Sequence, residues 1–227
     1  MKPQELCFPN LADCVAKLAA DLADCLGHAV DRRGRAGLAV SGGRTPEHIF
    51  PALSRKPLAW DRVSITLADE RWVDVDHPDS NEGLARRLLM QGPAAQARFI
   101  GLKTASETPF DGEAGVEANL AALDWPLDAV YLGMGEDGHI ASLFPAATDW
   151  RDAPGRALAV GAAGSRHPRM TLTPGALLDS RHIFLAITGP EKRAAFEAAL
   201  RPGPLVQYPV RLVLHQTDVP VTVYMVD

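Results

Sequence analysis

Apolar residues along the chain follow two spacings, one typical of helices and one typical of buried strands. Between Leu11 and Val30 they recur every three or four positions, which predicts an amphipathic helix that Asn10 can cap and that ends before Gly34. Short apolar or alternating runs predict strands elsewhere. These runs cover residues 37–40, 63–68, 98–100, 129–132, 157–160, 169–173, 182–188 and 219–226.

Capping residues and helical spacing place further helices between these strands. Thr45 and Pro46 form a helix start, Ser80 can cap another helix, and Thr173 with Pro174 can cap a short one. In addition to the helix that starts at Thr45 and Pro46, helices are expected over residues 81–90, 112–123, 174–178 and 191–200.

Strands that alternate with helices indicate an α/β fold. The expected architecture is a single-domain, Rossmann-like, mostly parallel sheet with helices on both faces. Residues 1–227 contain no internal repeat and no low-complexity linker, so they are expected to form this one domain. Two stretches are predicted to be loops. One is the acidic segment 69–79, and the other is segment 146–168, whose Gly, Ala, Pro and Arg content predicts mobility.

Composition excludes several classes of protein. Of the 227 residues, 47% are apolar and 22% are charged, which excludes intrinsic disorder for most of the chain. The 23 basic and 28 acidic residues give a net charge of −5, which argues against nucleic-acid and membrane-surface partners. No apolar stretch is long enough for a transmembrane helix, and residues 1–10 lack a signal-peptide pattern, so a cytoplasmic location is expected.

Three cysteines, Cys7, Cys14 and Cys25, lie near the N-terminus. Their odd number disfavours a disulfide framework, and their spacing matches no zinc motif. They are expected to pack on a helix face in a reducing compartment, in preference to a redox or metal role. No cluster of His, Cys and Asp has metal spacing in the rest of the sequence, so no metal site is expected.

Four loops follow the carboxyl ends of predicted strands, where parallel sheets bind their ligands. In the first, Gly42 and Gly43 precede a helix start, so backbone N–H groups and the helix dipole can hold an anion. In the second, Asp69 and Glu70 can hold the guanidinium of Arg71 against a phosphate or a carboxylate. Taken singly, each loop could equally be a tight turn or a solvated loop with internal ion pairs.

The third loop, residues 133–145, carries three glycines around Asp137 and His139. Asp137 lies two residues before His139 and can orient the ring or stabilise its protonated form, although a structural or solvated His is the alternative. The fourth loop puts Lys192 in the first turn of a helix, where a cation is unfavourable unless an anion lies nearby. Arg169, just before a predicted strand, is a fifth candidate.

Together these loops suggest a phosphorylated small molecule and a proton transfer centred on His139. No Ser or Cys lies in a nucleophile-elbow motif such as Gly-x-Ser-x-Gly. Without a protein nucleophile or a metal, a water molecule activated by a general base is the simplest chemistry.

The same motifs resemble the family of glucosamine-6-phosphate isomerases and 6-phosphogluconolactonases. The deaminase branch continues Gly-x-Asp-Gly-His into Ala-Phe-Asn-Glu-Pro, whereas this chain continues from Ala141 to Pro145 without an acid, which resembles the lactonase branch. Ile140 stands where that branch usually has Thr, a departure that removes no catalytic group. The matching segments keep the family's order and span most of the chain, at residues 41–46, 69–71, 80–81, 133–145, 169–173 and 189–192.

The resemblance implies hydrolysis of 6-phosphoglucono-1,5-lactone to 6-phosphogluconate, a step of the oxidative pentose phosphate pathway, without a cofactor. It implies that His139 is the general base and that Asp137 orients it. It further implies that Arg71 and Lys192 hold the phosphate. The substrate-binding residues expected in full are Gly42, Gly43, Asp69, Arg71, Arg169 and Lys192.

Two other functions stay open at this point. One is a deaminase-like reaction on an amino-sugar phosphate with Asp69 as the base, against which the missing Glu after Phe144 counts. The other is a non-catalytic sugar-phosphate-binding domain, but neither loss of the Asp–His pair nor an attached DNA-binding segment is seen. In each case the expected partner is a small sugar phosphate, and the chain is expected to be a monomer or a weak homodimer.

Overall fold

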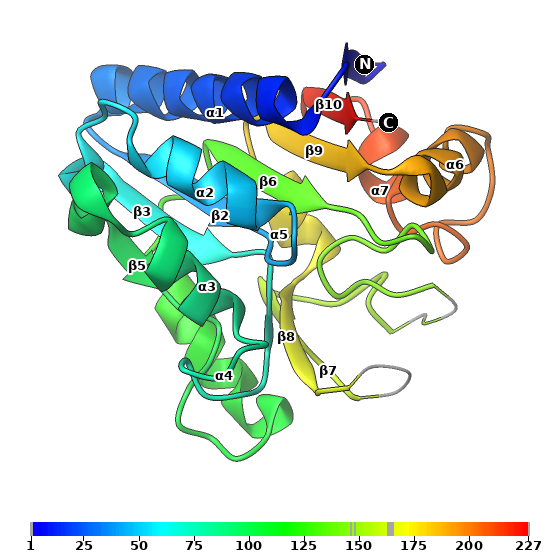
Figure 1. The fold of residues 1–227 in the computed structure, drawn as a ribbon. Coiled ribbons are helices and arrows are strands. Elements are labelled where there is room, and N and C mark those ends of the chain that lie inside the picture. Colours follow the sequence, from blue (N-terminus) through cyan, green and yellow to red (C-terminus); the bar gives the residue numbers. More distant parts are fainter. Residues whose placement is uncertain (1, 146, 148, 163–165, 227) are drawn as a thin grey trace.

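Seven parallel strands form the main sheet of the computed structural model, which describes residues 2–145, 147, 149–162 and 166–226 (Figure 1). Their order across the sheet is β1-β10-β9-β6-β2-β3-β5. Most positions of the central strands are buried, as expected for a parallel sheet with both faces covered. The strands span Gln4–Phe8 (β1), Ala36–Val40 (β2), Val63–Leu67 (β3), Arg98–Ile100 (β5), Ala129–Gly133 (β6), Ile183–Thr188 (β9) and Val221–Val226 (β10).

Helices cover both faces of this sheet, which confirms the predicted α/β class. Figure 1 shows α1 and α2 in front of the strands, and α5 and α7 behind them. Within the described residues, no helix combines the length and the apolar character that a membrane span requires. The helices span Leu11–Arg33 (α1), Pro46–Ser54 (α2), Asn81–Leu88 (α3), Pro109–Leu120 (α4), Pro174–Leu178 (α5), Pro190–Ala199 (α6) and Arg211–Leu214 (α7), with short 3-10 turns at Trp60–Arg62 and Gly92–Gln96.

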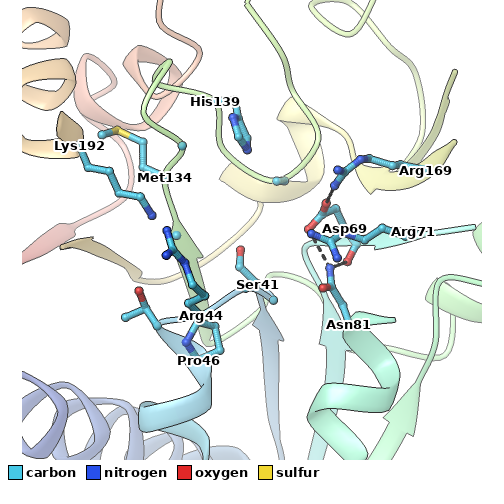
Figure 2. A pocket seen from close by; sticks show the side chains of 16 residues that line it. Ser41, Arg44, Pro46, Asp69, Arg71, Asn81, Met134, His139, Arg169 and Lys192 are labelled. Atoms are coloured by element: carbon cyan, nitrogen blue, oxygen red, sulfur yellow. Dashed lines mark hydrogen bonds and ion pairs between the residues drawn. The ribbon is translucent and has the colours of Figure 1, made fainter. Parts of the chain in front are cut away.

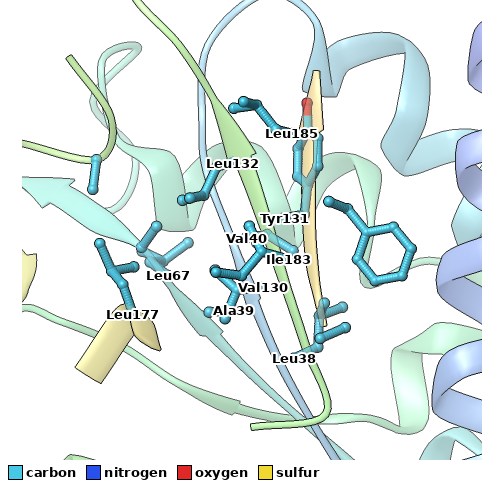
Figure 3. Close-up of a cluster of buried hydrophobic side chains, with 14 of the residues drawn as sticks. Leu38, Ala39, Val40, Leu67, Val130, Tyr131, Leu132, Leu177, Ile183 and Leu185 are labelled. Atoms are coloured by element: carbon cyan, nitrogen blue, oxygen red, sulfur yellow. The ribbon is translucent and has the colours of Figure 1, made fainter. Parts of the chain in front are cut away.

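Aliphatic side chains from the central strands form the core (Figure 3). Leu38 of β2, Val130 and Leu132 of β6, and Ile183 and Leu185 of β9 are fully buried. Burial of each such side chain contributes about 1.5–3 kcal/mol. The core therefore fixes the order and the direction of the strands whose ends carry the candidate loops.

Side-chain caps set the starts of several helices as predicted. The side chain of Asn10 accepts a hydrogen bond from the backbone N–H of Asp13, and Ser80 and Thr173 cap α3 and α5 in the same way. Gly34 follows α1 with a φ of 76°, the left-handed conformation that glycine adopts most easily.

Thr45 departs from its predicted role. Helix α2 begins at Pro46, but the Thr45 hydroxyl makes no capping hydrogen bond. It lies instead 3.2 Å from the hydroxyl of Thr188, at the end of β9. This contact joins the loop after β2 to the end of β9, so the Thr45 side chain is not used to cap the helix.

A second sheet of three antiparallel strands was not predicted. It consists of β4 (Asp69–Arg71), β8 (Arg169–Leu172) and β7 (Ala157–Val160), in that order. The prediction of a loop from residue 69 is therefore wrong for β4, whose three charged residues show no strand-like alternation. Segment 146–168, predicted as a mobile loop, contains β7, and its residues 146, 148 and 163–165 lie outside the described residues.

Strand β1 was also not predicted. It pairs with β10 at the edge of the main sheet, and its side chains Leu6 and Phe8 pack against the core. Two inward apolar positions are too few to produce a recognisable strand pattern. Cys7 lies in this strand and is exposed, so the prediction that all three cysteines pack on a helix face is wrong for Cys7. Burial raises the pKa of the Cys14 and Cys25 thiols of α1 to about 11.

Helix α7 was missed for a different reason, because it depends on one buried arginine. Arg211 is 3% exposed, and its guanidinium donates hydrogen bonds to the carbonyl oxygens of Ala199 and Pro204 and to the side chain of Gln207. Nη2 also donates to the carbonyl of Ala198. A cation is favourable at this carboxyl end of α6, where the last carbonyls lack partners in the helix.

We expect Arg211→Met to lower the free energy of unfolding by about 2–3 kcal/mol, because several buried carbonyls lose their donor. Urea unfolding followed by circular dichroism measures this change. Arg201→Met, at an exposed arginine just after α6, is the control and should leave stability nearly unchanged. Equal stability of the two variants would contradict this account of α7.

Candidate active site

The direction in which the chain adds strands to the sheet reverses between β2 and β6. From β2 the chain continues outward through β3 and β5, and then returns to the other side of β2 to form β6, β9 and β10. The loops that leave β2 and β6 therefore diverge, and open α/β sheets bind ligands in the crevice so formed. A pocket of about 270 Å³ lies there, lined by residues from all four predicted loops.

The loop after β2 brings bare backbone to the pocket. A Cβ at Gly42 would collide with the side chain of Asn81, and Gly43 has a φ of 102°. Both positions therefore disfavour a side chain. Their backbone faces the pocket just ahead of α2, whose N-terminus favours a bound anion.

The loop after β6 holds His139 in a tight turn. The N–H of Gly135 donates to the carbonyl of His139 at 2.9 Å, and the N–H of Gly138 donates to that of Gly135 at 3.0 Å. A Cβ at Gly135 would collide with the imidazole ring. Ala141 has a φ of 48°, a conformation that costs a non-glycine residue on the order of 1–3 kcal/mol. Strain of this kind is typical of loops that position a reactive group.

Asp137 fixes the tautomer of His139. Nδ1 of the ring lies 2.6 Å from Oδ1 of Asp137, which also accepts the backbone N–H of His139. A carboxylate only accepts hydrogen bonds, so Nδ1 carries a proton in either protonation state, and in the neutral ring Nε2 keeps its lone pair. Partial burial alone would raise the pKa of Asp137, but the hydrogen bond and charge of His139 hold it below its usual value. Figure 2 shows the imidazole reaching into the pocket.

Asp69 is buried, and both of its carboxylate oxygens accept hydrogen bonds. Its Oδ2 accepts the hydroxyl of Ser142 at 2.6 Å and pairs with Nη1 of Arg169 at 3.3 Å. Its Oδ1 accepts from the amide of Asn81 at 3.3 Å. Asp69 thus connects β4, β8 and the end of the His139 loop, and it positions Arg169 beside the pocket.

Glu70 lies beside it and anchors helix α3. Its carboxylate accepts hydrogen bonds from the backbone N–H groups of Arg71, Asn81 and Glu82 and from the hydroxyl of Ser80. Burial raises the pKa of Glu70 to about 7, although these four donors act in the opposite direction. The carboxylate holds the start of α3 against β4, so that Asn81 reaches Asp69.

Three buried polar atoms at the pocket lack a hydrogen-bond partner among the described residues. They are Oγ of Ser41, Nε of Arg71 and Nε of Arg169. A buried donor without a partner is unfavourable by about 1–3 kcal/mol, which a polar ligand can relieve. The two guanidinium groups therefore point to an oxygen-rich or anionic ligand.

Lys192 and Arg44 form a second cationic group. Figure 2 shows them on one side of the pocket, with Asp69, Arg71 and Arg169 on the other and with Ser41 and His139 between. Burial, followed by the positive charge of Arg44, lowers the pKa of Lys192, whereas Glu136 acts in the opposite direction. The pocket thus has two cationic ends with an imidazole between them.

The structure brings the predicted site residues together, with one change in grouping. Gly42, Gly43, Asp69, Arg71, His139, Arg169 and Lys192 all line the pocket, and Asp137 lies behind His139. Arg71 and Lys192, expected to share one phosphate, lie on opposite sides.

Asn81 and Ser142 were not assigned a role from the sequence. Both are buried partners of Asp69. Neither could be identified from spacing alone, since each contact with Asp69 is made only by folding.

Comparison with known proteins gives a consistent result. Residues 9–223 match the family model described as glucosamine-6-phosphate isomerases/6-phosphogluconolactonase. A 6-phosphogluconolactonase from Mesorhizobium japonicum is 45% identical over 96% of this chain and 92% of its own length. One from Pseudomonas aeruginosa is 41% identical over 90% of this chain and 88% of its own.

Solved structures agree with the sequence matches. The crystal structure of a 6-phosphogluconolactonase from Shewanella baltica superposes with a TM-score of 0.97 and 38% identity, covering 100% of this chain and 98% of that one. A monomeric glucosamine-6-phosphate deaminase shares the fold, with a TM-score of 0.78 at 19% identity, covering 97% and 96% of the two chains.

The raised pKa of Glu70 predicts a pH-dependent stability. The folded state binds this proton more tightly than the unfolded chain, so Glu70 should reduce stability as the pH rises from about 5 to about 8. We expect Glu70→Gln to flatten this part of the profile, measured as the free energy of unfolding in urea at several pH values. Glu197→Gln, on the exposed side of α6, is the control. A slope unchanged by Glu70→Gln would contradict the assignment.

Proposed function

The chain belongs to the family of glucosamine-6-phosphate isomerases and 6-phosphogluconolactonases, and we propose that it is a lactone hydrolase that converts 6-phosphogluconolactone into 6-phosphogluconate. The observation that carries this proposal is the Asp137–His139 pair, placed between two cationic groups at the crevice of the sheet. A phosphorylated lactone has one anionic end and one reactive carbonyl, and this arrangement suits both.

His139 is the general base in this proposal. Nε2 takes a proton from a water molecule whose oxygen attacks the lactone carbonyl carbon. The tetrahedral intermediate then breaks its bond to the ring oxygen, which takes the proton back from the imidazolium. Asp137 keeps the ring oriented and stabilises its positive charge in between. One water molecule is consumed and one carboxylic acid is formed, so the protein needs no covalent intermediate.

Lys192 and Arg44 hold the phosphate in this proposal. They share one side of the pocket with Pro46 at the N-terminus of α2, and the backbone of Gly42 and Gly43 also lines the pocket. Each of these elements favours an anion, and together they surround it with charge-assisted donors. An anion also relieves the repulsion between the two cations, which adds to the effect of burial in lowering the pKa of Lys192 in the empty pocket.

Arg169 and Arg71 serve the lactone end. The guanidinium of Arg169 lies 5.4 Å from the centre of the Phe144 ring, and the His139 ring lies 4.9 Å from the same ring. Arg169 therefore shares Phe144 as a neighbour with the general base, and in this proposal it faces the carbonyl oxygen on which negative charge develops. A donor held in place by Asp69 can stabilise that charge without reorganisation.

The deaminase alternative fits this site less well. Its base would be Asp69, but Ser142, Arg169 and Asn81 already occupy that carboxylate. The chain also carries Pro145, not an acid, after Phe144. The non-catalytic alternative leaves the strained loop and the oriented imidazole without a purpose.

We further propose that the enzyme works in the oxidative pentose phosphate pathway, in the cytoplasm, as a monomer or a weak homodimer. The shared chemistry of the named relatives supports the pathway. Three free thiols are typical of a reducing compartment.

We expect His139→Ala to lower kcat by about 10²–10⁴-fold, because a positioned general base contributes that much. The assay follows freshly prepared 6-phosphogluconolactone and subtracts spontaneous hydrolysis. His28→Ala, at an exposed histidine of α1, is the control and should keep full activity. Full turnover in a folded His139→Ala protein would reject His139 as the base.

Removal of Lys192 should act on the phosphate selectively. We expect Lys192→Ala to reduce kcat/KM for the phosphorylated lactone, with a loss of transition-state stabilisation on the order of 2–4 kcal/mol. The kcat/KM for unphosphorylated gluconolactone should fall far less. Arg71→Ala should reduce kcat/KM for the two substrates to a similar extent. Arg193→Ala, the neighbouring residue of α6, is the control for general effects. A selective loss in Arg71→Ala instead would assign the phosphate to the opposite side of the pocket.

A further inference from the structure

Two loops outside the substrate pocket bring two histidines and an aspartate together. His77 and Asp79 lie between β4 and α3, and His167 lies just ahead of β8. One potential ligand atom from each of these side chains falls within 4.8 Å of the others. Nε2 of His167 lies 2.9 Å from Oδ2 of Asp79, and Nδ1 of His77 lies 4.0 Å from the same oxygen. This group was not predicted, because His167 lies far along the chain from His77 and Asp79.

These donors suit a transition metal ion. Imidazole nitrogens and a carboxylate oxygen bind Zn²⁺ at about 2.0–2.2 Å, which puts the ligand atoms of a tetrahedral site about 3.3 Å apart. Side-chain rotations that move the ligand atoms of His77, Asp79 and His167 by about 1 Å or less would bring them to that spacing. The three side chains are partly exposed, so an ion can enter and water can complete its coordination.

The surroundings permit such an ion. Nδ1 of His77 accepts a hydrogen bond from the backbone N–H of Asp79 at 3.0 Å, so this nitrogen carries no proton, and a bound ion would take the place of that hydrogen bond. Arg166 lies 3.5 Å from the Asp79 carboxylate, but its side chain is 80% exposed. A surface ion pair of this kind contributes about 0–1 kcal/mol, so a divalent ion can displace it.

We propose that His77, Asp79 and His167 form a binding site for a divalent transition metal of the Zn²⁺ class. The sequence alone predicted no metal site. The ion would join the residues ahead of β8 to the loop ahead of α3. Nη1 of Arg71 donates to the carbonyl oxygen of Asp79 at 2.7 Å. The metal site therefore adjoins a residue that lines the substrate pocket.

The test is titration of the full chain, free of any polyhistidine tag, with zinc chloride in an isothermal calorimeter. We expect one site in the wild type, with an affinity weakened by at least about 10–100-fold in His77→Ala and in His167→Ala. His28→Ala removes an exposed histidine far from the cluster and should bind like the wild type. Asp79→Asn removes one ligand but keeps the side-chain volume and the backbone carbonyl, so it tests the site even if an alanine variant fails to fold. Thermal unfolding reports whether each variant is folded.

Co²⁺ gives a spectroscopic readout of the same site. Its visible absorption bands should report tetrahedral coordination in the wild type and should disappear in His167→Ala. Wild-type affinity for Zn²⁺ in both alanine variants, or no binding by the wild type, would overturn the proposal. Because the measurement is of metal binding and not of turnover, its result is separate from that of the lactone assay.

Discussion

The parallel direction of all seven strands in the main sheet is the constraint on which the site depends. It brings the carboxyl ends of β2, β3, β6 and β9 to one edge, although the segments that follow them lie far apart in the sequence. Since the strand order reverses between β2 and β6, the loops at that point diverge and leave a crevice. The core fixes this arrangement, because a shift of any central strand would expose side chains such as Leu38 or Val130.

Two adjacent buried carboxylates then convert this edge into an ordered pocket. Glu70 fixes the start of α3, and Asp69 gathers Ser142, Arg169 and Asn81 from three other elements. Buried charge is unfavourable unless it is compensated, and here Asp69 pairs with Arg169 whereas Glu70 accepts four hydrogen bonds. These contacts therefore hold the second sheet in one position relative to the main sheet. They also direct Arg169 toward the pocket that His139 lines.

The pocket separates its charges in a way that suits a phosphorylated lactone. Lys192 and Arg44 offer positive charge at one end, and Arg71 and Arg169 offer it at the other. His139 lies between, kept in one tautomer by Asp137. In the proposed reaction the enzyme contributes position and electrostatics, because a lactone carbonyl is already reactive toward water. The backbone strain at Ala141 is consistent with a loop shaped for this purpose.

Local patterns in the sequence were sufficient for six of the seven strands of the main sheet and for most helices, and they marked the loops that line the pocket. Apolar runs identified the buried strands of that sheet, Asn10, Ser80 and Thr173 marked helix starts, and the glycines around His139 marked its loop. These signals depend on neighbours within a few residues, so the sequence contains them directly. The edge strand β1, the charged strand β4 and the short helix α7 were not recognisable, since each is stabilised by partners distant along the chain. For the same reason only the tertiary structure decided that Arg71 and Lys192 face each other across the pocket, that Asp69 has Ser142 and Asn81 as partners, and that His77 and Asp79 meet His167. Contacts between remote segments follow from how the strands are ordered and packed, and residue spacing along the chain carries no record of that order.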